Sequence, residues 1–400
     1  MQPNNQHRDP SSSRSHVAPF HVMDVLAAAQ QRQRTHGDAL LLCVGQPATA
    51  APAPVLRRAR ADLDNQVLGY TAAVGKPELR ATIAAWHRDT YGTSTAAEDV
   101  VITTGSSGGF VALFLAALDA GDDIVLARPG YPAYRNTLQA LGANIIEIDC
   151  GVESRFQLTV EHLQTLPRVP KAVIVTSPDN PTGTIIDAEE LRAIADWCAD
   201  HDCLLISDEI YHGITYGRQC ASAREFSDQA VVVGSVSKYF SMTGWRIGWL
   251  IVPEWLRAPL DRLEANLTVC PPAISQAAAV EAFSAESLAE LNSHVDRYAR
   301  NRDVLLEGLP AVGLDNIAPP DGGFYIYANI AGLYDDPTAV DSMTWARELL
   351  AATGVAVAPG IDFDTAHGHE WVRLCFAGQT SEMEEAVRRI GAFTGRSLDR

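Results

Sequence analysis

Residues 171–211 read KAVIVTSPDNPTGTIIDAEELRAIADWCADHDCLLISDEIY, and this stretch contains the pattern that decides the fold. It begins and ends with short runs of valine, isoleucine and leucine. Such runs are typical of strands that are buried on both faces of a parallel sheet. Between them, Leu191, Ile194 and Cys198 recur at helical spacing, and acidic residues crowd the first turn, where the helix dipole favours them. The stretch therefore predicts a strand, a helix and a second strand.

The same kind of run recurs on both sides of this unit. Five more runs are DVVITTG (99–105), DDIVLAR (122–128), NIIEIDC (144–150), AVVVGSVSK (230–238) and GWLIVP (248–253). Helical patterns lie between them, which is the arrangement of α/β proteins. We therefore expect an α/β fold with a mainly parallel seven-stranded sheet that is sandwiched by helices.

The pattern changes after about residue 287. Long helical segments (287–309 and 381–395) alternate there with the strand-like runs GGFYIYANI (322–330), GVAVAPG (354–360) and WVRLCFA (371–377). A chain of 400 residues also exceeds the size of a single core. We expect a disordered start (1–18), a large domain (50–290) and a smaller α+β domain formed by residues 19–49 and 291–400.

Composition narrows the class of protein. The chain has 49 acidic and 31 basic residues, and its net charge of -18 disfavours contact with nucleic acid or anionic membranes. Its seven cysteines are scattered without a CxxC pair, which is typical of reduced thiols. The polar amino terminus has no apolar core of a signal peptide, and no run of about 18 apolar residues occurs. We therefore expect a cytoplasmic protein.

Polar side chains follow most of the predicted strands. Parallel α/β sheets bind ligands at the carboxyl ends of their strands, so these side chains should meet at one edge. The segment TGSSGGF (104–110) places glycines and hydroxyls at a junction of strand and helix, which suits a phosphate. The other strands are followed by Tyr131, Asn180, Asp208, Tyr211 and Lys238.

These groups together match the requirements of pyridoxal phosphate. A lysine amine forms a Schiff base with its aldehyde, and a carboxylate keeps its pyridine nitrogen protonated. A phenol and an amide bond the ring oxygen, while an arginine and hydroxyls hold the phosphate. In SVSKYFSMTGWRIGW (235–249), Arg246 follows Lys238 by eight residues and can fold back onto that phosphate.

Three motifs carry a resemblance to a known family. SVSKYFSMTGWRIGW, SPDNPTG (177–183) and SDEIYHG (207–213) resemble the signatures of class I aminotransferases of fold type I. The subgroup that they resemble includes bacterial aspartate, alanine and branched-chain or aromatic aminotransferases. The likeness extends from about residue 20 to residue 393. It implies transfer of an amino group from an L-α-amino acid to a 2-oxo acid, with pyridoxal 5′-phosphate as cofactor.

The resemblance also implies roles for individual residues. Lys238 would be the Schiff-base lysine and the base that moves the substrate Cα proton, and Asp208 would pair with the pyridine nitrogen. Asn180 and Tyr211 would bond the ring oxygen, and Tyr131 would stack on the ring. The residues expected around the phosphate are Gly105, Ser106, Ser107, Ser235, Ser237 and Arg246.

Two further roles concern the substrate and a second subunit. Arg373 would grip the substrate α-carboxylate, with help from Asn180 and the Gly45 backbone. Tyr70 matches a tyrosine that family members send across a dimer interface to the neighbour's phosphate, so we expect a homodimer with shared active sites. Burial beside Arg246 should lower the pKa of Lys238, which must be neutral to act as a base.

The substrate side chain is expected to be neutral. Some aspartate-type members carry a lysine beyond the phosphate turn, but here FVALFLAAL (110–118) has Leu115 near that place and no cation. The amino-terminal segment offers Phe20, Val22 and Met23, and such a lining would leave a second carboxylate unpaired. We therefore expect alanine or valine to be a better donor than aspartate, although an arginine from elsewhere could supply the charge.

Other functions remain open at this point. A β-lyase or decarboxylase that uses pyridoxal phosphate would share nearly every residue. A transcription regulator with a ligand domain of this kind would need a helix-turn-helix domain, for which the short amino terminus has no room. The HGHE segment (367–370) lacks the histidine spacing of a helical zinc site, so no metal is expected.

Overall fold

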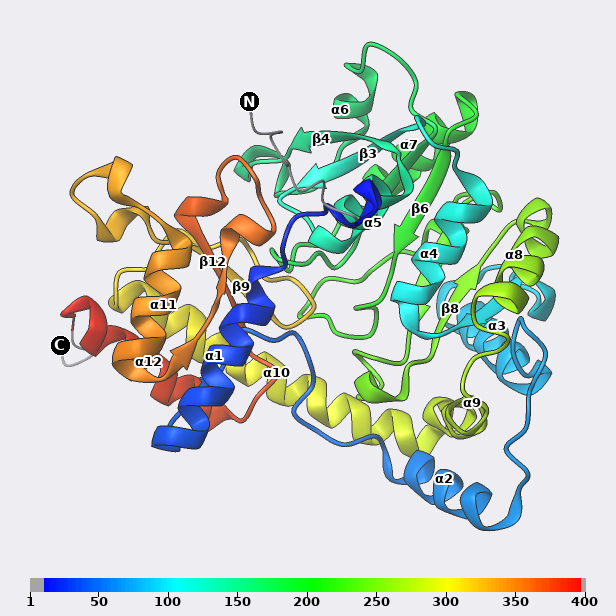
Figure 1. Cartoon of the computed structure of the whole chain (residues 1–400), viewed down its shortest axis with the longest axis horizontal. Coiled ribbons are helices and arrows are strands. Elements are labelled where there is room, and N and C mark those ends of the chain that lie inside the picture. The colour runs from blue at the N-terminus through cyan, green and yellow to red at the C-terminus, as the bar shows by residue number, and fades with distance from the viewer. Residues whose placement is uncertain (1–10, 397–400) are drawn as a thin grey trace, which may run out of the picture.

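The computed structural model describes residues 11–396 and consists of α-helices around three sheets (Figure 1). The helices are α1 (His21–His36), α2 (Ala53–Asn65), α3 (Pro77–Tyr91), α4 (Gly105–Ala117), α5 (Pro132–Leu141), α6 (Val160–Gln164), α7 (Ala188–Asp200), α8 (Glu254–Leu267), α9 (Ala273–Ala279), α10 (Ala285–Ala311), α11 (Ser342–Thr353) and α12 (Thr380–Thr394). The strands are β1 (Leu40–Leu41), β2 (Val100–Thr103), β3 (Asp123–Arg128), β4 (Asn144–Asp149), β5 (Ala172–Thr176), β6 (Leu204–Asp208), β7 (Val231–Ser235), β8 (Gly248–Ile251), β9 (Tyr325–Asn329), β10 (Val355–Ala356), β11 (Ala358–Pro359) and β12 (Trp371–Cys375).

The largest sheet has seven strands in the order β2-β8-β7-β6-β5-β3-β4. The pairs among β4, β3, β5, β6 and β7 are parallel, whereas β8 is antiparallel to both of its neighbours. All seven runs predicted from the sequence form this sheet, so the prediction of a mainly parallel seven-stranded α/β fold is confirmed. Because β5, β6 and β7 are neighbouring parallel strands, their carboxyl ends lie side by side.

Both faces of this sheet are covered because the strand residues alternate between two cores. Val173 and Val175 pack with helices α3 and α7, whereas Ala172 and Ile174 pack with α4, α5 and α8. Residues 172–176 are therefore buried at every position. This double burial explains why the strands read as unbroken apolar runs rather than as an alternation.

The carboxyl-terminal third forms a separate antiparallel sheet in the order β11-β12-β9, packed with α10, α11 and α12. The amino-terminal strand β1 pairs in parallel with β10, through Leu40 with Val355. Helix α1 accordingly lies beside α11 and β11 in space, although it is far from them in sequence (Figure 1). The run expected as a single strand over residues 354–360 is divided between β10 and β11, which belong to different sheets.

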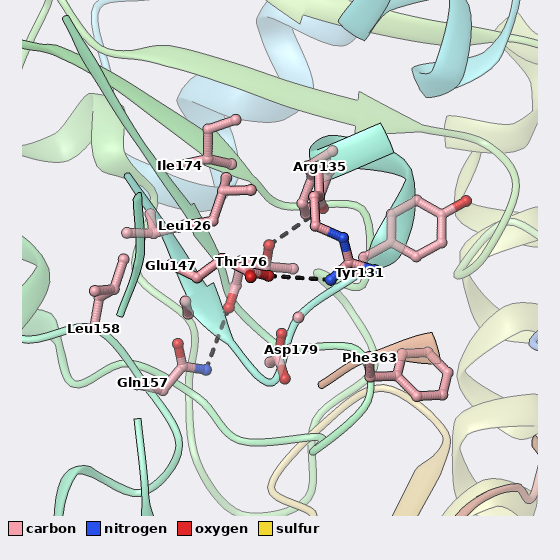
Figure 2. Close-up of a pocket in the computed structure, with 14 residues that line it drawn as sticks. Leu126, Tyr131, Arg135, Glu147, Gln157, Leu158, Ile174, Thr176, Asp179 and Phe363 are labelled. Carbon is pink, nitrogen blue, oxygen red and sulfur yellow. Dashed lines mark hydrogen bonds and ion pairs between the residues drawn. The ribbon is translucent and has the colours of Figure 1, made fainter. Parts of the chain in front are cut away.

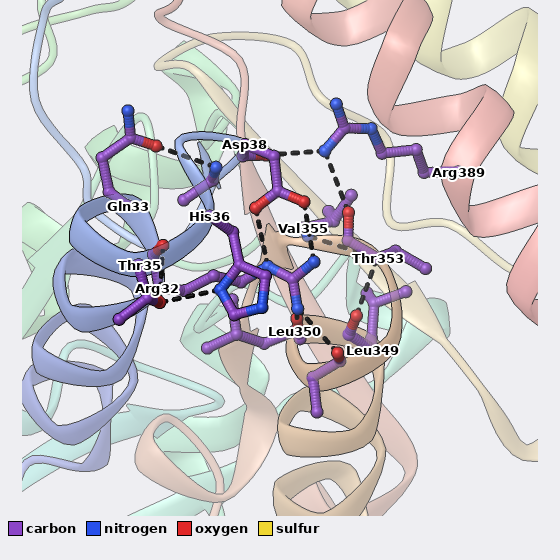
Figure 3. Close-up of polar contacts among 12 residues, drawn as sticks. Arg32, Gln33, Thr35, His36, Asp38, Leu349, Leu350, Thr353, Val355 and Arg389 are labelled. Atoms are coloured by element: carbon purple, nitrogen blue, oxygen red, sulfur yellow. Dashed lines mark hydrogen bonds and ion pairs between the residues drawn. The ribbon is translucent and has the colours of Figure 1, made fainter.

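Two arginines join the ends of the chain around the last turn of α11 (Figure 3). Arg32 donates to the carbonyls of Leu350 and Ala351 and pairs with Asp38 at 2.7 Å. Arg389 donates to the carbonyls of Thr353 and Asp38. The bonds to Ala351 and Thr353 satisfy carbonyl groups that a helix leaves free at its carboxyl terminus. They fix α1, α11 and α12 to one another.

Part of the expected disordered start lies outside the described residues, namely residues 1–10. The remainder includes a 3-10 turn at Ser13–Ser15. Within residues 11–396, no helix combines the length and apolar character needed to cross a bilayer.

Candidate active site

A cavity of about 290 Å³ opens at the carboxyl ends of β5, β6 and β7. Most of the residues predicted to form the site line this cavity: Gly45, Ser106, Ser107, Tyr131, Asn180, Asp208, Tyr211, Ser237, Lys238, Arg246 and Arg373. Gly105, Ser235 and Tyr70 do not line it. Segments separated by more than 300 residues in the chain thus meet at one edge of the large sheet, where β12 and the segment after β1 close the cavity.

Lys238 follows β7 and lies against the amino-terminal segment. Its Nζ donates a hydrogen bond to the Gly45 carbonyl at 2.6 Å. Burial lowers the pKa of Lys238 to about 8, and the neighbouring cations Arg373 and Arg246 act in the same direction. The amine can therefore exist in its neutral form close to neutral pH, as a nucleophile or a base requires.

Asp208 is the last residue of β6 and is 3% exposed. Its Oδ1 accepts from the backbone N–H of Ile210 at 3.1 Å, and its Oδ2 accepts from the hydroxyl of Tyr134. Burial raises the pKa of Asp208 to about 6, while the Tyr134 bond opposes that rise. A buried carboxylate held by two donors is suited to a cationic partner such as a protonated ring nitrogen.

Aromatic side chains form two walls of the cavity. Tyr131 precedes α5, and its ring centre lies 5.3 Å from that of Tyr134 and 6.3 Å from that of Phe20. Tyr211 is 3% exposed, and its hydroxyl lies 2.7 Å from the hydroxyl of Tyr325. Burial raises the pKa of Tyr211, so its phenol remains protonated and can donate.

Arg373 extends from β12 and is 3% exposed. Its Nη1 donates to Asn180 Oδ1 at 2.8 Å and its Nη2 donates to the Cys43 carbonyl at 2.7 Å. The guanidinium lies over the rings of Tyr325 and Phe363, at 4.4 Å and 4.6 Å from their centres. Its Nε is buried without a hydrogen-bond partner in the described residues. A buried cation whose bonds go only to neutral groups is suited to an anion such as a carboxylate.

The opposite end of the cavity has the features of a phosphate site. Helix α4 begins at Gly105, and Ser106 and Ser107 lie in its first turn, where free N–H groups and the helix dipole favour an anion. Gly105 has φ +69°, and a Cβ there would collide with the guanidinium of Arg246. The close approach of Arg246 to this helix terminus therefore requires glycine.

Ser235 does not reach the phosphate end of the cavity directly, because it lies behind Ser237. Its hydroxyl lies 2.8 Å from Ser237 Oγ and 2.9 Å from the accepting carbonyl of Ile247, and it accepts from the Ser237 backbone N–H at 3.0 Å. Ser237 lines the cavity, whereas Ser235 is buried behind it. The structure therefore gives Ser235 contacts to Ser237 rather than to the cavity.

Tyr70 lies away from the cavity of its own chain. It is 88% exposed and lines a surface hollow with Arg58 and Lys76. A role for Tyr70 in a neighbour's site stays a prediction.

A small inner cavity of about 20 Å³ lies behind Tyr131, with room for one water molecule (Figure 2). Asp179 lines it, and its carboxylate accepts from the hydroxyl of Thr182 at 2.7 Å. Burial raises the pKa of Asp179 to about 7. The ion pair of Arg135 with Glu147, at 3.0 Å, closes another side of this inner cavity.

Several residues of the site were missed in the sequence. Tyr134 could have been found, because it lies one helical turn after Tyr131 and so faces the same side. Tyr325 and Phe363 could not, because no local pattern separates them from core aromatics. Tyr325 reaches the cavity through the pairing of β9 with β12, whereas Phe363 lines the inner cavity and contacts Arg373.

Part of the cavity forms an apolar wall, as expected. Phe20, Val22 and Met23 line the cavity, while Leu115 is 41% exposed on α4 and does not line it. The charged residues that line the cavity are Asp208, Lys238, Arg246 and Arg373. All three cations already have the positions described above, so among residues 11–396 no further cation lines the cavity.

The residues fit pyridoxal 5′-phosphate. The helix terminus with Arg246 matches a phosphate, the buried Asp208 matches a protonated ring nitrogen, and Lys238 supplies an amine of lowered pKa. No group of three histidine, cysteine, aspartate or glutamate side chains in residues 11–396 is arranged to hold a metal ion. In the HGHE segment, His367 pairs with Asp149 at 3.3 Å.

Comparisons with known proteins place these features in a wider context. Residues 37–390 match the family model "Aminotransferase class I and II". Over 382 residues, 95% of this chain and 97% of the relative, the chain is 52% identical to the valine–pyruvate aminotransferase of Mycobacterium tuberculosis. It is 34% identical over 386 residues, 95% and 97% of the two chains, to the aspartate/prephenate aminotransferase of Thermus thermophilus.

Solved structures agree in fold. An aminotransferase from Mycobacterium tuberculosis superposes with a TM-score of 0.94 at 50% identity, over 97% of this chain and 100% of that chain. The aspartate aminotransferase from Thermus thermophilus with maleate superposes with a TM-score of 0.90 at 31% identity, over 96% and 100% of the two chains.

Proposed function

The chain belongs to the class I and II aminotransferases, whose members use pyridoxal 5′-phosphate, and we propose that its amino donor is a neutral aliphatic L-α-amino acid such as valine or alanine. The acceptor would be pyruvate or 2-oxoglutarate, in a ping-pong reaction through pyridoxamine phosphate. One observation carries the choice of donor. The cavity offers Arg373 for a single carboxylate, and its lining includes the apolar side chains of Phe20, Val22 and Met23.

The 52% identity to a valine–pyruvate aminotransferase supports the same choice. A side-chain carboxylate would be desolvated against this wall without a cation, which is strongly unfavourable. Methyl groups of valine would instead replace water there.

Different residues of the site would hold different parts of the cofactor. When bound, the cofactor supplies a protonated pyridine ring that takes up the electron pair released as the substrate Cα–H bond breaks. Asp208 would hold the proton on the ring nitrogen, and Asn180 and Tyr211 would face the ring oxygen. Tyr131 would cover the ring. The phosphate would be held by Gly105, Ser106, Ser107, Ser237 and Arg246, with Ser235 supporting Ser237.

Arg373 and Lys238 would act on the substrate. Arg373 binds and orients its α-carboxylate, so that the Cα–H bond can point toward Lys238. The Nζ of Lys238 would remove the Cα proton and deliver it to the aldehyde carbon (C4′) of the cofactor, and it would move a proton in the opposite direction when the acceptor 2-oxo acid becomes an amino acid. Its lowered pKa, about 8, makes this base available near neutral pH. The aromatic walls exclude water from the reacting atoms.

A β-lyase is the alternative with the same residues. The relatives reported above are all named as aminotransferases, so the comparisons do not favour it. The two reactions are also separable by their products.

The assembly and the location are part of this proposal. Six large apolar residues are exposed on the segment that ends α2 and on the end of α8: Leu63, Val67, Leu68, Tyr70, Leu267 and Val269. Such a patch is typical of an interface, and it contains Tyr70, so we propose a homodimer with shared sites. All seven cysteines are unpaired, which supports the cytoplasm as the location.

The first experiment is a visible absorbance spectrum of the purified protein with pyridoxal 5′-phosphate, taken before and after single L-amino acids without an acceptor. We expect a band that depends on Lys238 and that valine or alanine abolishes much faster than aspartate. The Lys238→Ala variant serves as the control and should show no such response. Aspartate as the best donor by kcat/KM would contradict the choice of donor. Pyruvate or ammonia released while the band persists would favour the lyase.

A further inference from the structure

We propose that Tyr325 is a positioning residue that joins the carboxylate clamp Arg373 to the phenol of Tyr211. The inference rests on the proposed function, because it concerns how these two groups are held. Tyr325 is the first residue of β9 and is 1% exposed, yet it lines the cavity. Three separate contacts lead to this inference.

The first contact is a hydrogen bond between phenols. The hydroxyls of Tyr325 and Tyr211 lie 2.7 Å apart, and both rings are buried. If Tyr211 donates to a ring oxygen in the cavity, its own oxygen must accept the proton of Tyr325. A donor at that oxygen makes Tyr211 the stronger donor in turn, because hydrogen bonds in series polarise one another.

The second contact is with the arginine. The guanidinium of Arg373 lies 4.4 Å from the centre of the Tyr325 ring and 4.6 Å from the centre of the Phe363 ring. Two flat rings fix the plane of the guanidinium, and the bonds to Asn180 and Cys43 fix its rotation within that plane. A planar fork that is fixed in both respects binds a carboxylate in one orientation.

The third contact is with Gly45. A Cβ at residue 45 would lie 1.8 Å from Tyr325 Oη, so glycine is required there while Tyr325 holds its position. The carbonyl of Gly45 accepts the hydrogen bond from Lys238 Nζ at 2.6 Å. Tyr325 therefore packs against the backbone that places Lys238, as well as against Tyr211 and Arg373.

A buried tyrosine in a strand is often only part of the core, and Tyr327 offers the comparison within the same strand. Tyr327 is also 1% exposed, but it stacks on Trp371 and does not line the cavity. Its hydroxyl has no hydrogen-bond partner in the described residues. Tyr327→Phe thus removes a buried hydroxyl from β9 without touching the site, and is the matched control for Tyr325→Phe.

The test uses the protein loaded with cofactor and records the visible band as a function of pH, which is independent of turnover. Tyr325→Phe removes the donor to Tyr211 and keeps the ring under Arg373. Tyr211 then donates more weakly to the ring oxygen of the cofactor, so the Schiff-base nitrogen of Lys238 should keep its proton to higher pH. The pH midpoint of the change in the visible band should therefore rise by about half a pH unit to one unit. The donor KM should stay within about twofold of the wild-type value.

Two further variants separate the contacts. Tyr325→Leu also removes the ring and should raise the donor KM by about tenfold, because the plane of Arg373 is no longer fixed. In a Tyr211→Phe background, Tyr325→Phe should leave the midpoint where Tyr211→Phe alone places it, because the effect passes through Tyr211. Melting temperatures of all variants without cofactor report any general loss of stability.

The outcomes are distinct. Tyr325→Phe that behaves like Tyr327→Phe in midpoint and KM would overturn the inference, as would equal midpoint shifts in the wild-type and Tyr211→Phe backgrounds. Should Tyr325→Leu fail to fold, Tyr325→Phe and the double variant still decide. A wild-type protein without any band that depends on Lys238 would overturn the proposed function, and this inference with it.

Discussion

At the scale of single residues, Tyr134 is the group whose removal tests the carboxylate of Asp208. Tyr134→Phe deletes the hydroxyl that donates to Asp208 Oδ2, so the pKa of Asp208 should rise further and its anion should become less available. Hydrogen bonds to charged groups contribute about 1.5–3 kcal/mol, so we expect kcat to fall by at least about tenfold. The acidic limb of the pH profile should move to higher pH. Thr176→Ala is the comparison, because Thr176 lies 3.2 Å from the same hydroxyl without bonding Asp208. An unchanged acidic limb in Tyr134→Phe would contradict this role.

Asp179 gives a second prediction, which concerns stability. Burial raises its folded pKa to about 7, above its ordinary value of 3.8, so the folded protein binds this proton more tightly than the unfolded chain. The stability that this group contributes is therefore present below about pH 4 and is lost as pH rises toward about 7. Relative to Asp179→Asn, the wild-type protein should lose roughly 1.4 kcal/mol of unfolding free energy per pH unit across that window.

Urea unfolding of the two proteins without cofactor, at several pH values between about 5 and 8, measures this difference. Asparagine keeps an acceptor for the Thr182 hydroxyl, so the fold of the SPDNPTG turn should survive. A difference in unfolding free energy that does not vary with pH would show that Asp179 does not titrate in this range.

The sequence predicts that a residue belongs to the site where its side chain lies at the end of a strand. It does not do so where tertiary packing alone brings the side chain into the site. Asn180 and Lys238 follow β5 and β7, and Asp208 ends β6, so the topology of parallel sheets is enough to bring them together. Tyr325 reaches the cavity only because β9 pairs with β12, which carries Arg373. No periodicity in residues 322–330 distinguishes Tyr325 from the buried Tyr327.

At the scale of elements, the strands of the large sheet were predictable because burial on both faces leaves continuous apolar runs. The short strands β10 and β11 were not, since residues 354–360 read as one run although Val357 separates two pairings. A two-residue strand is too short to show a pattern of its own and exists only through its hydrogen bonds to the neighbouring strand. The same holds for β1, where only Leu40 and Leu41 of a longer apolar segment pair.

The start of helix α1 supplies a prediction at this scale. Asp362 accepts hydrogen bonds from the backbone N–H groups of His21 at 2.9 Å and Val22 at 2.7 Å. This carboxylate caps the helix from a distant turn and places Val22 and Met23 in the cavity. Loss of a cap costs about 1 kcal/mol, so Asp362→Ala should raise the donor KM by about fivefold with a smaller effect on kcat.

Asp24→Ala is the matched control, because Asp24 is also acidic and near the start of α1 but is exposed and lies only near His21, at 3.7 Å. Steady-state kinetics with valine would compare the two variants. Equal KM values for Asp362→Ala and Asp24→Ala would mean that the cap does not position the apolar wall.

At the scale of the whole molecule, we propose that residues 19–49 and 291–400 form the smaller domain and residues 50–290 the larger one. The pairing of β1 with β10 and the arginine bonds around α11 tie the first segment to the last. The cavity lies where these parts meet, since Gly45 and Arg373 face Asp208 and Lys238 across it. Movement of the smaller part would then change the distance between the carboxylate clamp and the base.

The assembly makes the last prediction. If Tyr70 serves the neighbour's phosphate site, each active site needs Lys238 from one chain and Tyr70 from the other. Tyr70→Ala and Lys238→Ala should each be strongly impaired as pure proteins. A mixed dimer of the two, isolated with two different affinity tags after co-expression, contains one site in which both residues are intact and should recover about half of the wild-type activity.

Val67→Asp tests the interface itself, because Val67 is 97% exposed in the same patch as Tyr70. This variant should shift the sedimentation coefficient toward that of the monomer and should lower the activity as well. A mixed dimer that stays as inactive as its parents, or a fully active monomer, would remove the shared-site model, because no chain alone brings Tyr70 to its own cavity.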